Sequence, residues 1–232
     1  MQKTILIPCY NEKNSIETVL KNVKKNISED DNIIIIDDGS NDGTTEILKK
    51  YENDKQIECI FNNTNLGKGS AIISGLNKSS KINDVVLIQD ADLEYDPEDY
   101  KKVFLPFYET NADVVYGSRF LGGAKYYRLH FFWHLIANKI LTLVCNLVTN
   151  LNMTDMETGY KCFKKDAILS INLREKSFGI EPEITVKLSK KKFKFFEVPI
   201  SYNGRSYAEG KKIQLKDAFV AIYCIIKYRF FD

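Results

Sequence analysis

Histidine and cysteine are scarce in this chain of 232 residues, and neither is clustered. The two histidines, His130 and His134, lack the intervening glutamate of a zinc-protease motif. The five cysteines are scattered and contain no Cys-x-x-Cys pair, so they do not indicate a disulfide framework. We therefore expect no histidine-bound metal, reduced thiols and a cytoplasmic location.

An excess of one charge and long apolar runs are also lacking. The formal net charge is +2, which predicts no nucleic acid or other polyanion as a partner. Met1-Gln2-Lys3 leads directly into a short apolar run, so no signal peptide is indicated. No stretch reaches the roughly 18 uncharged apolar residues of a membrane span; residues 131–151 come nearest but include Lys139. Hydrophobic residues make up 44% of the chain, which is enough for a globular core.

Strand-like and helix-like patterns alternate along the first half. Runs rich in β-branched residues predict strands at 4–8, 32–37, 57–61 and 85–89. Between them, helical spacing predicts helices at 15–26, 42–51 and 69–78, the second with Ser40 or Asn41 as its N-cap. This alternation is typical of a parallel α/β sheet flanked by helices.

The second half contains fewer and longer elements. We expect a strand at 112–117, a mostly apolar helix at 127–151, an edge strand at 193–199 and a final helix at 214–229. The long helix carries only a narrow polar stripe, so we expect most of its surface to be buried against other elements or a partner. No linker or repeat interrupts the chain, and we expect a single domain at 1–232.

Two carboxylates one residue apart, Asp90 and Asp92, follow the fourth predicted strand. Ligands of open α/β sheets bind outside the carboxyl ends of the strands. Oxygen ligands at this spacing suit a hard divalent cation that also holds phosphates. On its own, the same pattern is compatible with an ordinary polar turn.

Polar motifs follow the other predicted parallel strands as well. Because the carboxyl ends of such strands converge on one crevice, these motifs are expected to share a site. Asp37 and Asp38 can accept hydrogen bonds from a ribose or a base, and Lys68 and Arg119 can neutralise phosphate oxygens. Nucleotide-sugar chemistry fits this inventory. The motifs are Pro8-Cys9-Tyr10-Asn11-Glu12, Asp37-Asp38-Gly39-Ser40, Asn65-Leu66-Gly67-Lys68-Gly69 and Gly117-Ser118-Arg119.

Together with Asp90-Ala91-Asp92, these motifs resemble glycosyltransferase family 2, whose members have the GT-A fold. The chain is most similar to the dolichyl- or polyprenyl-phosphate mannosyl synthase branch and its bacterial relatives. Three later segments support that branch: Thr158-Gly159-Tyr160-Lys161-Cys162-Phe163, Phe178-Gly179-Ile180-Glu181-Pro182-Glu183, and Arg205 followed by Glu209-Gly210-Lys211-Lys212-Ile213.

The resemblance implies a role for each matching residue. Asp90, Asp92 and Glu94 would hold Mg²⁺ or Mn²⁺, although relatives often carry Gln in place of Glu94. Residues 1–120 would form the nucleotide-sugar-binding half. Residues 121–232 would form the acceptor-side half with its amphipathic helices. The expected substrate-binding residues are Pro8, Tyr10, Glu12, Asp37, Asp38, Lys68, Asp90, Ala91, Arg119, Arg128, Arg205 and Lys211.

The implied reaction is inverting sugar transfer from a nucleotide diphosphate sugar, of the GDP-mannose or UDP-glucose type, to a lipid phosphate. A phosphate acceptor is already anionic and needs no strong base, whereas a hydroxyl acceptor does. Asp155 and Glu157 are the candidate bases. The expected catalytic residues are Asp92, Arg119 and Asp155.

Aromatic and basic residues near the long helix, and a second apolar run at 219–226, favour contact with a membrane interface. We expect a peripheral protein at the cytoplasmic membrane face, bound to the surface directly or through a membrane partner protein. Two alternatives stay open. One is a transferase that extends a polysaccharide or glycolipid at a sugar hydroxyl, and the other is a non-catalytic nucleotide-sugar-binding protein.

Overall fold

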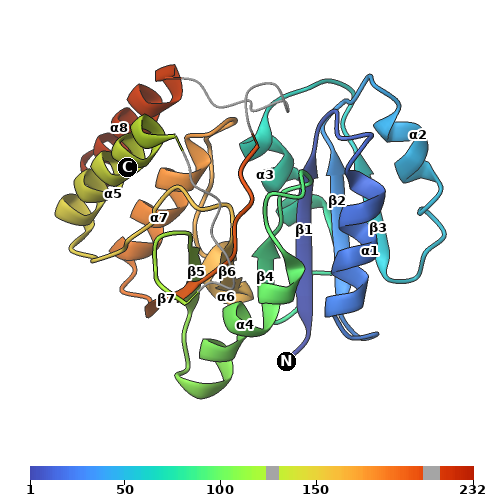
Figure 1. The fold of residues 1–232 in the computed structure, drawn as a ribbon, viewed down its shortest axis with the longest axis horizontal. Coiled ribbons are helices and arrows are strands. Elements are labelled where there is room, and N and C mark those ends of the chain that lie inside the picture. The colour runs from blue at the N-terminus through green and yellow to red at the C-terminus, as the bar shows by residue number, and fades with distance from the viewer. Residues whose placement is uncertain (124–130, 206–214) are drawn as a thin grey trace.

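A central β-sheet organises the protein, whose computed structural model describes residues 1–123, 131–205 and 215–232 (Figure 1). In this part of the chain the sheet has seven strands in the order β3-β2-β1-β4-β6-β5-β7. β6 runs antiparallel to both its neighbours, and the other strands share one direction. The strands are β1 (Lys3–Cys9), β2 (Asn32–Asp37), β3 (Ile57–Phe61), β4 (Val85–Ile88), β5 (Val114–Ser118), β6 (Lys161–Lys164) and β7 (Phe195–Pro199).

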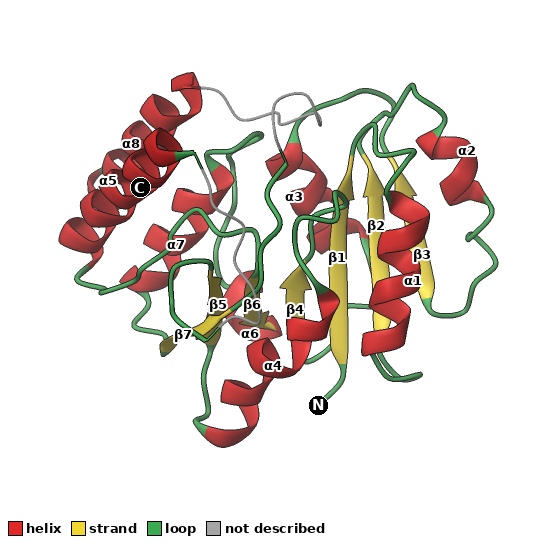
Figure 2. Cartoon of the chain, viewed as in Figure 1, coloured by secondary structure: helices red, strands yellow, loops and turns green. Residues whose placement is uncertain are grey.

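Helices cover both faces of the sheet (Figure 2). The hydrophobic cluster on one face contains residues of α1 and α4. The cluster on the other face contains residues of α3, α5, α6, α7 and α8. The helices of the described residues are α1 (Ile16–Asn26), α2 (Thr44–Lys49), α3 (Lys68–Lys78), α4 (Tyr100–Glu109), α5 (Phe132–Thr149), α6 (Lys165–Leu169), α7 (Ile180–Lys190) and α8 (Leu215–Phe230).

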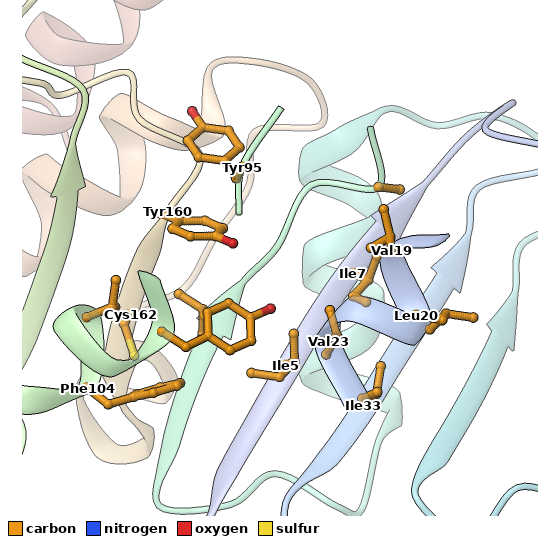
Figure 3. Close-up of a cluster of buried hydrophobic side chains, with 14 of the residues drawn as sticks. Ile5, Ile7, Val19, Leu20, Val23, Ile33, Tyr95, Phe104, Tyr160 and Cys162 are labelled. Carbon is orange, nitrogen blue, oxygen red and sulfur yellow. The ribbon is translucent and has the colours of Figure 1, made fainter. Parts of the chain in front are cut away.

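The four consecutive isoleucines of β2 show why this strand is continuously apolar. Side chains alternate across a strand, so Ile33 and Ile35 join the cluster under α1, and Ile34 and Ile36 join the other cluster. All four are buried. Figure 3 shows Val19 and Val23 of α1 over the first face. Burial on both faces is typical of parallel strands between helix layers, and it confirms the predicted α/β class.

Two predicted helices differ from the observed ones. α2 covers only Thr44–Lys49, and its N-cap is Gly43 rather than Ser40 or Asn41. The carboxylate of Asp42 binds the Thr44 amide at 2.9 Å and closes this turn instead. The described part of the long apolar helix begins at Phe132 and ends where Asn150 adopts a left-handed conformation.

Four of the helices and strands were not predicted from the sequence: β6, α4, α6 and α7. β6 has only four residues, and it is defined by pairing with β4 and β5 rather than by a local pattern. α7 has no solvent-exposed face to reveal its helical period, because its polar and apolar residues alike are buried along nearly its whole length. The predicted edge strand is confirmed as β7, which ends the sheet.

Among the described residues, α5 is long and apolar enough to cross a membrane, judged by length and composition alone. A core helix of a soluble protein meets the same criterion. α5 packs against α7 and α8 through a buried side that includes Leu141 and Cys145.

Candidate active site

A cavity of about 350 Å³ lies at the carboxyl ends of the parallel strands. Eleven of the predicted substrate and metal residues line it, which confirms that motifs distant in sequence share one crevice. They are Pro8, Tyr10, Glu12, Asp38, Lys68, Asp90, Ala91, Asp92, Glu94, Arg119 and Arg205.

Two predicted site residues do not line this cavity. Asp37 instead accepts hydrogen bonds from the Ser40 amide at 3.1 Å and from the hydroxyl of Thr45, and so closes the turn after β2. Asp155 is fully buried behind Arg119. Arg128 and Lys211 lie outside the described residues.

An acidic cluster forms where β4 ends, and one arginine lies within it. Nη2 of Arg205 is 2.8 Å from Asp92 Oδ2, and its Nε is 3.2 Å from Glu94 Oε1. Its Nη1 is 3.3 Å from Glu12 Oε1. One guanidinium therefore contacts three carboxylates that come from the ends of two neighbouring strands.

The local backbone packs these carboxylates closely. Leu93 adopts a left-handed conformation (φ 62°), and the Glu94 amide donates to Asp92 Oδ1 at 3.1 Å. Burial, with the nearby charges of Asp90 and Glu94, raises the pKa of Asp92 to about 7, although Arg205 acts in the opposite sense. A site that disfavours its own negative charge to this extent attracts a cation.

The donor set fits a hard divalent ion, because it consists of carboxylate oxygens. Within the described residues, however, no group of three or more metal-ligating side chains is already arranged around one point. Arg205 binds Asp92 and Glu94, and Lys68 Nζ binds Asp90 at 2.8 Å. In this structure cationic side chains stand where the expected ion would be bound.

A second group of charges forms the inner wall of the cavity. Besides Asp90, Lys68 contacts Glu181 Oε1 at 3.0 Å, and Lys161 contacts Glu181 Oε2 at 2.7 Å. Burial alone would lower the pKa of Lys68, but the two carboxylates hold it well above its usual value. Lys68 was predicted as a phosphate ligand; here it ties the end of β4 to α7.

Arg119 is held by a buried partner at the end of β5. Its Nε and Nη2 are each 2.7 Å from an oxygen of Asp155, and Asn138 of α5 donates to the same carboxylate at 3.1 Å. Burial would raise the pKa of Asp155, but the guanidinium outweighs it and lowers that pKa. The Arg119 guanidinium also lies 5.0 Å from the ring centroid of Tyr202.

Stacked aromatic side chains pack beside the acidic cluster that follows β4. The rings of Tyr95 and Tyr160 are stacked at 4.7 Å (Figure 3). The hydroxyls of Tyr160 and Tyr100 both donate to Gln89 Oε1, at 2.6 and 2.8 Å. The Gly159 amide in turn donates to the Tyr95 hydroxyl at 2.7 Å. A Cβ on Gly159 would lie 2.3 Å from Asp90 Oδ2, so only glycine permits this approach.

The segment around Glu181 resembles the family, but its sequence indicates no role for Glu181, and no pattern in the sequence marks Tyr95 or Tyr202 as site residues. Glu181 has no motif of its own, because its charge acquires meaning only beside Lys68 and Lys161. Tyr202 donates to the Glu94 carboxylate and lies in a bridge with Tyr95. Such long-range contacts have no local signal in a single sequence.

The sheet order and the strand-end crevice define a GT-A fold, and the comparisons with known proteins agree. Residues 4–171 match the family described as "Glycosyl transferase family 2". The protein therefore belongs to glycosyl transferase family 2.

Two relatives match over most of their length. The UDP-N-acetylglucosamine–dolichyl-phosphate N-acetylglucosaminyltransferase of Methanococcus voltae is 31% identical over 91% of this chain and 90% of its own. The undecaprenyl-phosphate mannosyltransferase of Micrococcus luteus is 28% identical over 91% of this chain and 87% of its own.

A solved structure shows the same fold. Glucosyl-3-phosphoglycerate synthase from Mycobacterium tuberculosis, in complex with Mn²⁺, UDP and phosphoglyceric acid, superposes with a TM-score of 0.73 at 15% identity. The match covers 98% of this chain and 76% of that one.

Proposed function

We propose that the protein transfers a sugar from a nucleotide diphosphate sugar to a polyprenyl phosphate. The observation that carries the proposal is the cavity, which combines an oxygen-rich cluster at the end of β4 with the anchored cation Arg119. The named activities of both relatives, each of which uses a polyprenyl-type phosphate, support it. Residues 1–120 supply most of the donor site, and residues 121–232 supply the acceptor side.

Asp90, Asp92 and Glu94 are the residues that would hold Mg²⁺ or Mn²⁺, as the Mn²⁺ in the matched solved structure supports. The ion, when bound, supplies charge neutralisation for the leaving diphosphate. Arg205 must then leave Asp92 and Glu94. From the same loop its guanidinium becomes available to the anionic donor, to which it contributes a second positive charge.

The transfer itself requires little acid–base chemistry. A phosphate oxygen of the acceptor attacks the anomeric carbon, and the bond from that carbon to the diphosphate oxygen breaks with inversion. Nε and Nη2 of Arg119 donate to Asp155, whereas Nη1 of Arg119 makes no hydrogen bond to a described residue. Arg119 is thus positioned to orient a phosphate group, while Pro8, Tyr10 and Asp38 line the nucleotide side.

Transfer assays test the proposal. With Mn²⁺ and labelled UDP-N-acetylglucosamine, UDP-glucose or GDP-mannose, we expect product on a short polyprenyl phosphate and none after EDTA. Asp92→Asn should lose at least 100-fold in rate, since one lost electrostatic contact to a transition state is worth about that much. Asp166→Asn, at an exposed position on α6, is the matched control. Product on an oligosaccharide alone would contradict the proposal.

We further propose that α5 and α8 bind the cytoplasmic membrane surface. The two helices lie side by side (Figure 1). Together they expose large apolar side chains, and Lys227 and Arg229 lie in the last turn of α8. Aromatic and basic residues of this kind favour a lipid interface. The exposed residues are Phe132, Trp133, Ile140, Leu143, Leu147, Phe219, Val220, Tyr223, Ile226 and Phe230.

Sedimentation with anionic phospholipid vesicles tests this surface. We expect the wild-type protein to co-sediment and the pair Trp133→Ser and Phe219→Ser to weaken binding at least tenfold. Leu105→Ser, at an exposed position on α4, should bind as the wild type does. Equal binding by all three proteins would refute the assignment.

A further inference from the structure

One carboxyl oxygen on the wall of the cavity has no hydrogen-bond partner among the described residues. Glu157 lines the cavity, and its Oε1 is buried without a hydrogen bond to any described residue. The other acidic groups nearby have cationic partners: Glu181 pairs with Lys68 and Lys161, and Asp155 pairs with Arg119. Glu181 Oε2 also makes no hydrogen bond, but it lies 2.7 Å from Lys161 Nζ. A buried oxygen without a hydrogen bond is unfavourable because its desolvation is not compensated, and a bound ligand would supply the missing partner.

The surroundings restrict what that ligand group can be. Lys161 and Arg119, the cations beside Glu157, are each paired with another carboxylate, Glu181 and Asp155, so a phosphate placed directly against Glu157 would meet a carboxyl group that has no cation of its own. A neutral group that donates or accepts a hydrogen bond has no such penalty. Sugar hydroxyls are groups of this kind, and a carboxyl oxygen binds them well.

The position of Glu157 agrees with a sugar ligand. It precedes Gly159, whose Cα packs against Asp90, and it faces the same cavity as Arg119 and Glu181. The nucleotide-side residues Pro8 and Asp38 come from the ends of β1 and β2. Glu157 comes from the chain just before β6, on the other side of β4 in the strand order. A donor that spans the crevice would bring its sugar toward Glu157.

We propose that Glu157 binds a hydroxyl of the transferred sugar and thereby selects the donor. This inference rests on the proposed transferase function and assigns Glu157 a substrate contact instead of the role of a base. The contact belongs to the donor sugar, not to the nucleotide, the metal or the acceptor. Its loss should therefore change discrimination between sugars and leave nucleotide affinity unchanged.

Calorimetry in the presence of Mn²⁺ measures this effect. Two ligands are compared: the nucleotide diphosphate alone and the nucleotide sugar that the wild type turns over. The gain is the factor by which the nucleotide sugar binds more tightly than the diphosphate. For Glu157→Ala we expect this gain to fall 10- to 100-fold, with the affinity for the diphosphate unchanged. Donors that each lack one sugar hydroxyl make the test more specific. For one of these deoxy donors the wild type should bind 10- to 100-fold more weakly than it binds the complete donor. Glu157→Ala should bind that deoxy donor and the complete donor equally well.

Glu157→Leu keeps roughly the volume of the side chain but cannot hydrogen-bond a hydroxyl, and it serves if the alanine variant does not fold. Glu58→Ala, in β3 away from the cavity, is the control and should behave as the wild type. Unchanged discrimination against every deoxy donor, or an effect confined to the acceptor KM, would overturn the inference. Failure of the wild type to bind a nucleotide or turn over any donor would instead refute the proposed function.

Discussion

Asp155 shows how much a residue's role depends on its neighbours. Its position just before Thr158-Gly159-Tyr160-Lys161 made it a candidate base, but both its oxygens are engaged by Arg119, and Asn138 donates to the same group. A carboxylate in this state is a weak proton acceptor, because the ion pair lowers its pKa. Its geometry is that of a residue that positions the arginine.

Asp155→Asn should therefore destabilise the protein. Removing one member of a buried ion pair leaves the other charge uncompensated and costs about 3–5 kcal/mol. We expect a fall in Tm of roughly 6–20 °C for a chain of this length. Asp113→Asn breaks a half-exposed pair with Lys164 and should cost less than about 1 kcal/mol. Equal losses in calorimetric scans of the two variants would contradict this assignment.

Glu157 should make stability depend on pH. Burial raises its pKa from 4.5 to about 7, with a smaller contribution from Glu181 and opposition from Lys161 and Arg119. Between these two values the folded state keeps a proton that the unfolded chain releases, so the free energy of unfolding falls as pH rises through this window. Burial also places Asp92 in the same range.

Urea unfolding at pH 5, 6, 7 and 8 measures this dependence. In Glu157→Gln we expect a shallower fall than in the wild type, with the difference on the order of a few kcal/mol across the window. Titration of Asp92 should account for the remaining pH dependence of the free energy of unfolding in Glu157→Gln. Identical slopes in the two proteins would show that Glu157 does not titrate there.

At the scale of elements, one short loop connects the donor site to the C-terminal helix. The carbonyl of Lys176 accepts a hydrogen bond from Ser70, in the first turn of α3, at 3.0 Å. Glu175 accepts from Lys227 and Tyr228 of α8 at 2.9 and 2.6 Å. The loop thus joins the helix that carries Lys68 to the proposed membrane face.

Gly69 makes that junction possible. A Cβ at this position would lie 2.1 Å from the Glu175 carbonyl oxygen, which belongs to the backbone and cannot turn away. Gly69→Ala should cost about 1–3 kcal/mol, as overpacking does, and should weaken donor binding through Lys68. Gly122→Ala adds a Cβ that meets nothing within 4 Å and is the control. Denaturant unfolding and nucleotide titration would check both effects.

The elements that the sequence predicted are those with a local signal. The isoleucines of β2 and the spacing of Ile16, Val19, Leu20 and Val23 in α1 are visible without tertiary contacts. β6 and α7 were missed because neighbours define them. The same division holds in the site: strand-end motifs located the cavity, whereas Glu181 and Tyr202 act through partners far along the chain.

The whole molecule has almost no net charge, but its carboxylates and its exposed apolar side chains lie in separate regions. Carboxylates gather at one edge of the sheet, and the exposed apolar side chains of α5 and α8 form a separate surface. Because α7 packs against α8 and carries Glu181, the two regions belong to one continuous structure. A fragment that lacked α8 would lose the partners of Glu175 as well as the part of the apolar face that α8 contributes.

Ligand binding should be visible in the stability of the whole chain. With Mn²⁺ and UDP or GDP at a hundred times the dissociation constant, mass action adds about 2.7 kcal/mol to the free energy of unfolding. That corresponds to a rise in Tm of roughly 5–10 °C. EDTA should abolish the rise, and Asp92→Asn should not show it. A rise that survives EDTA would exclude the metal from nucleotide binding.

The contact of Arg205 with Glu12, Asp92 and Glu94 has a thermodynamic consequence. A divalent ion that enters this cluster must exchange with a guanidinium, and the displaced arginine then needs a new anion. The diphosphate of the donor is that anion. Ion and nucleotide should therefore each raise the affinity of the other by the same factor, and the empty site should hold either one alone only weakly.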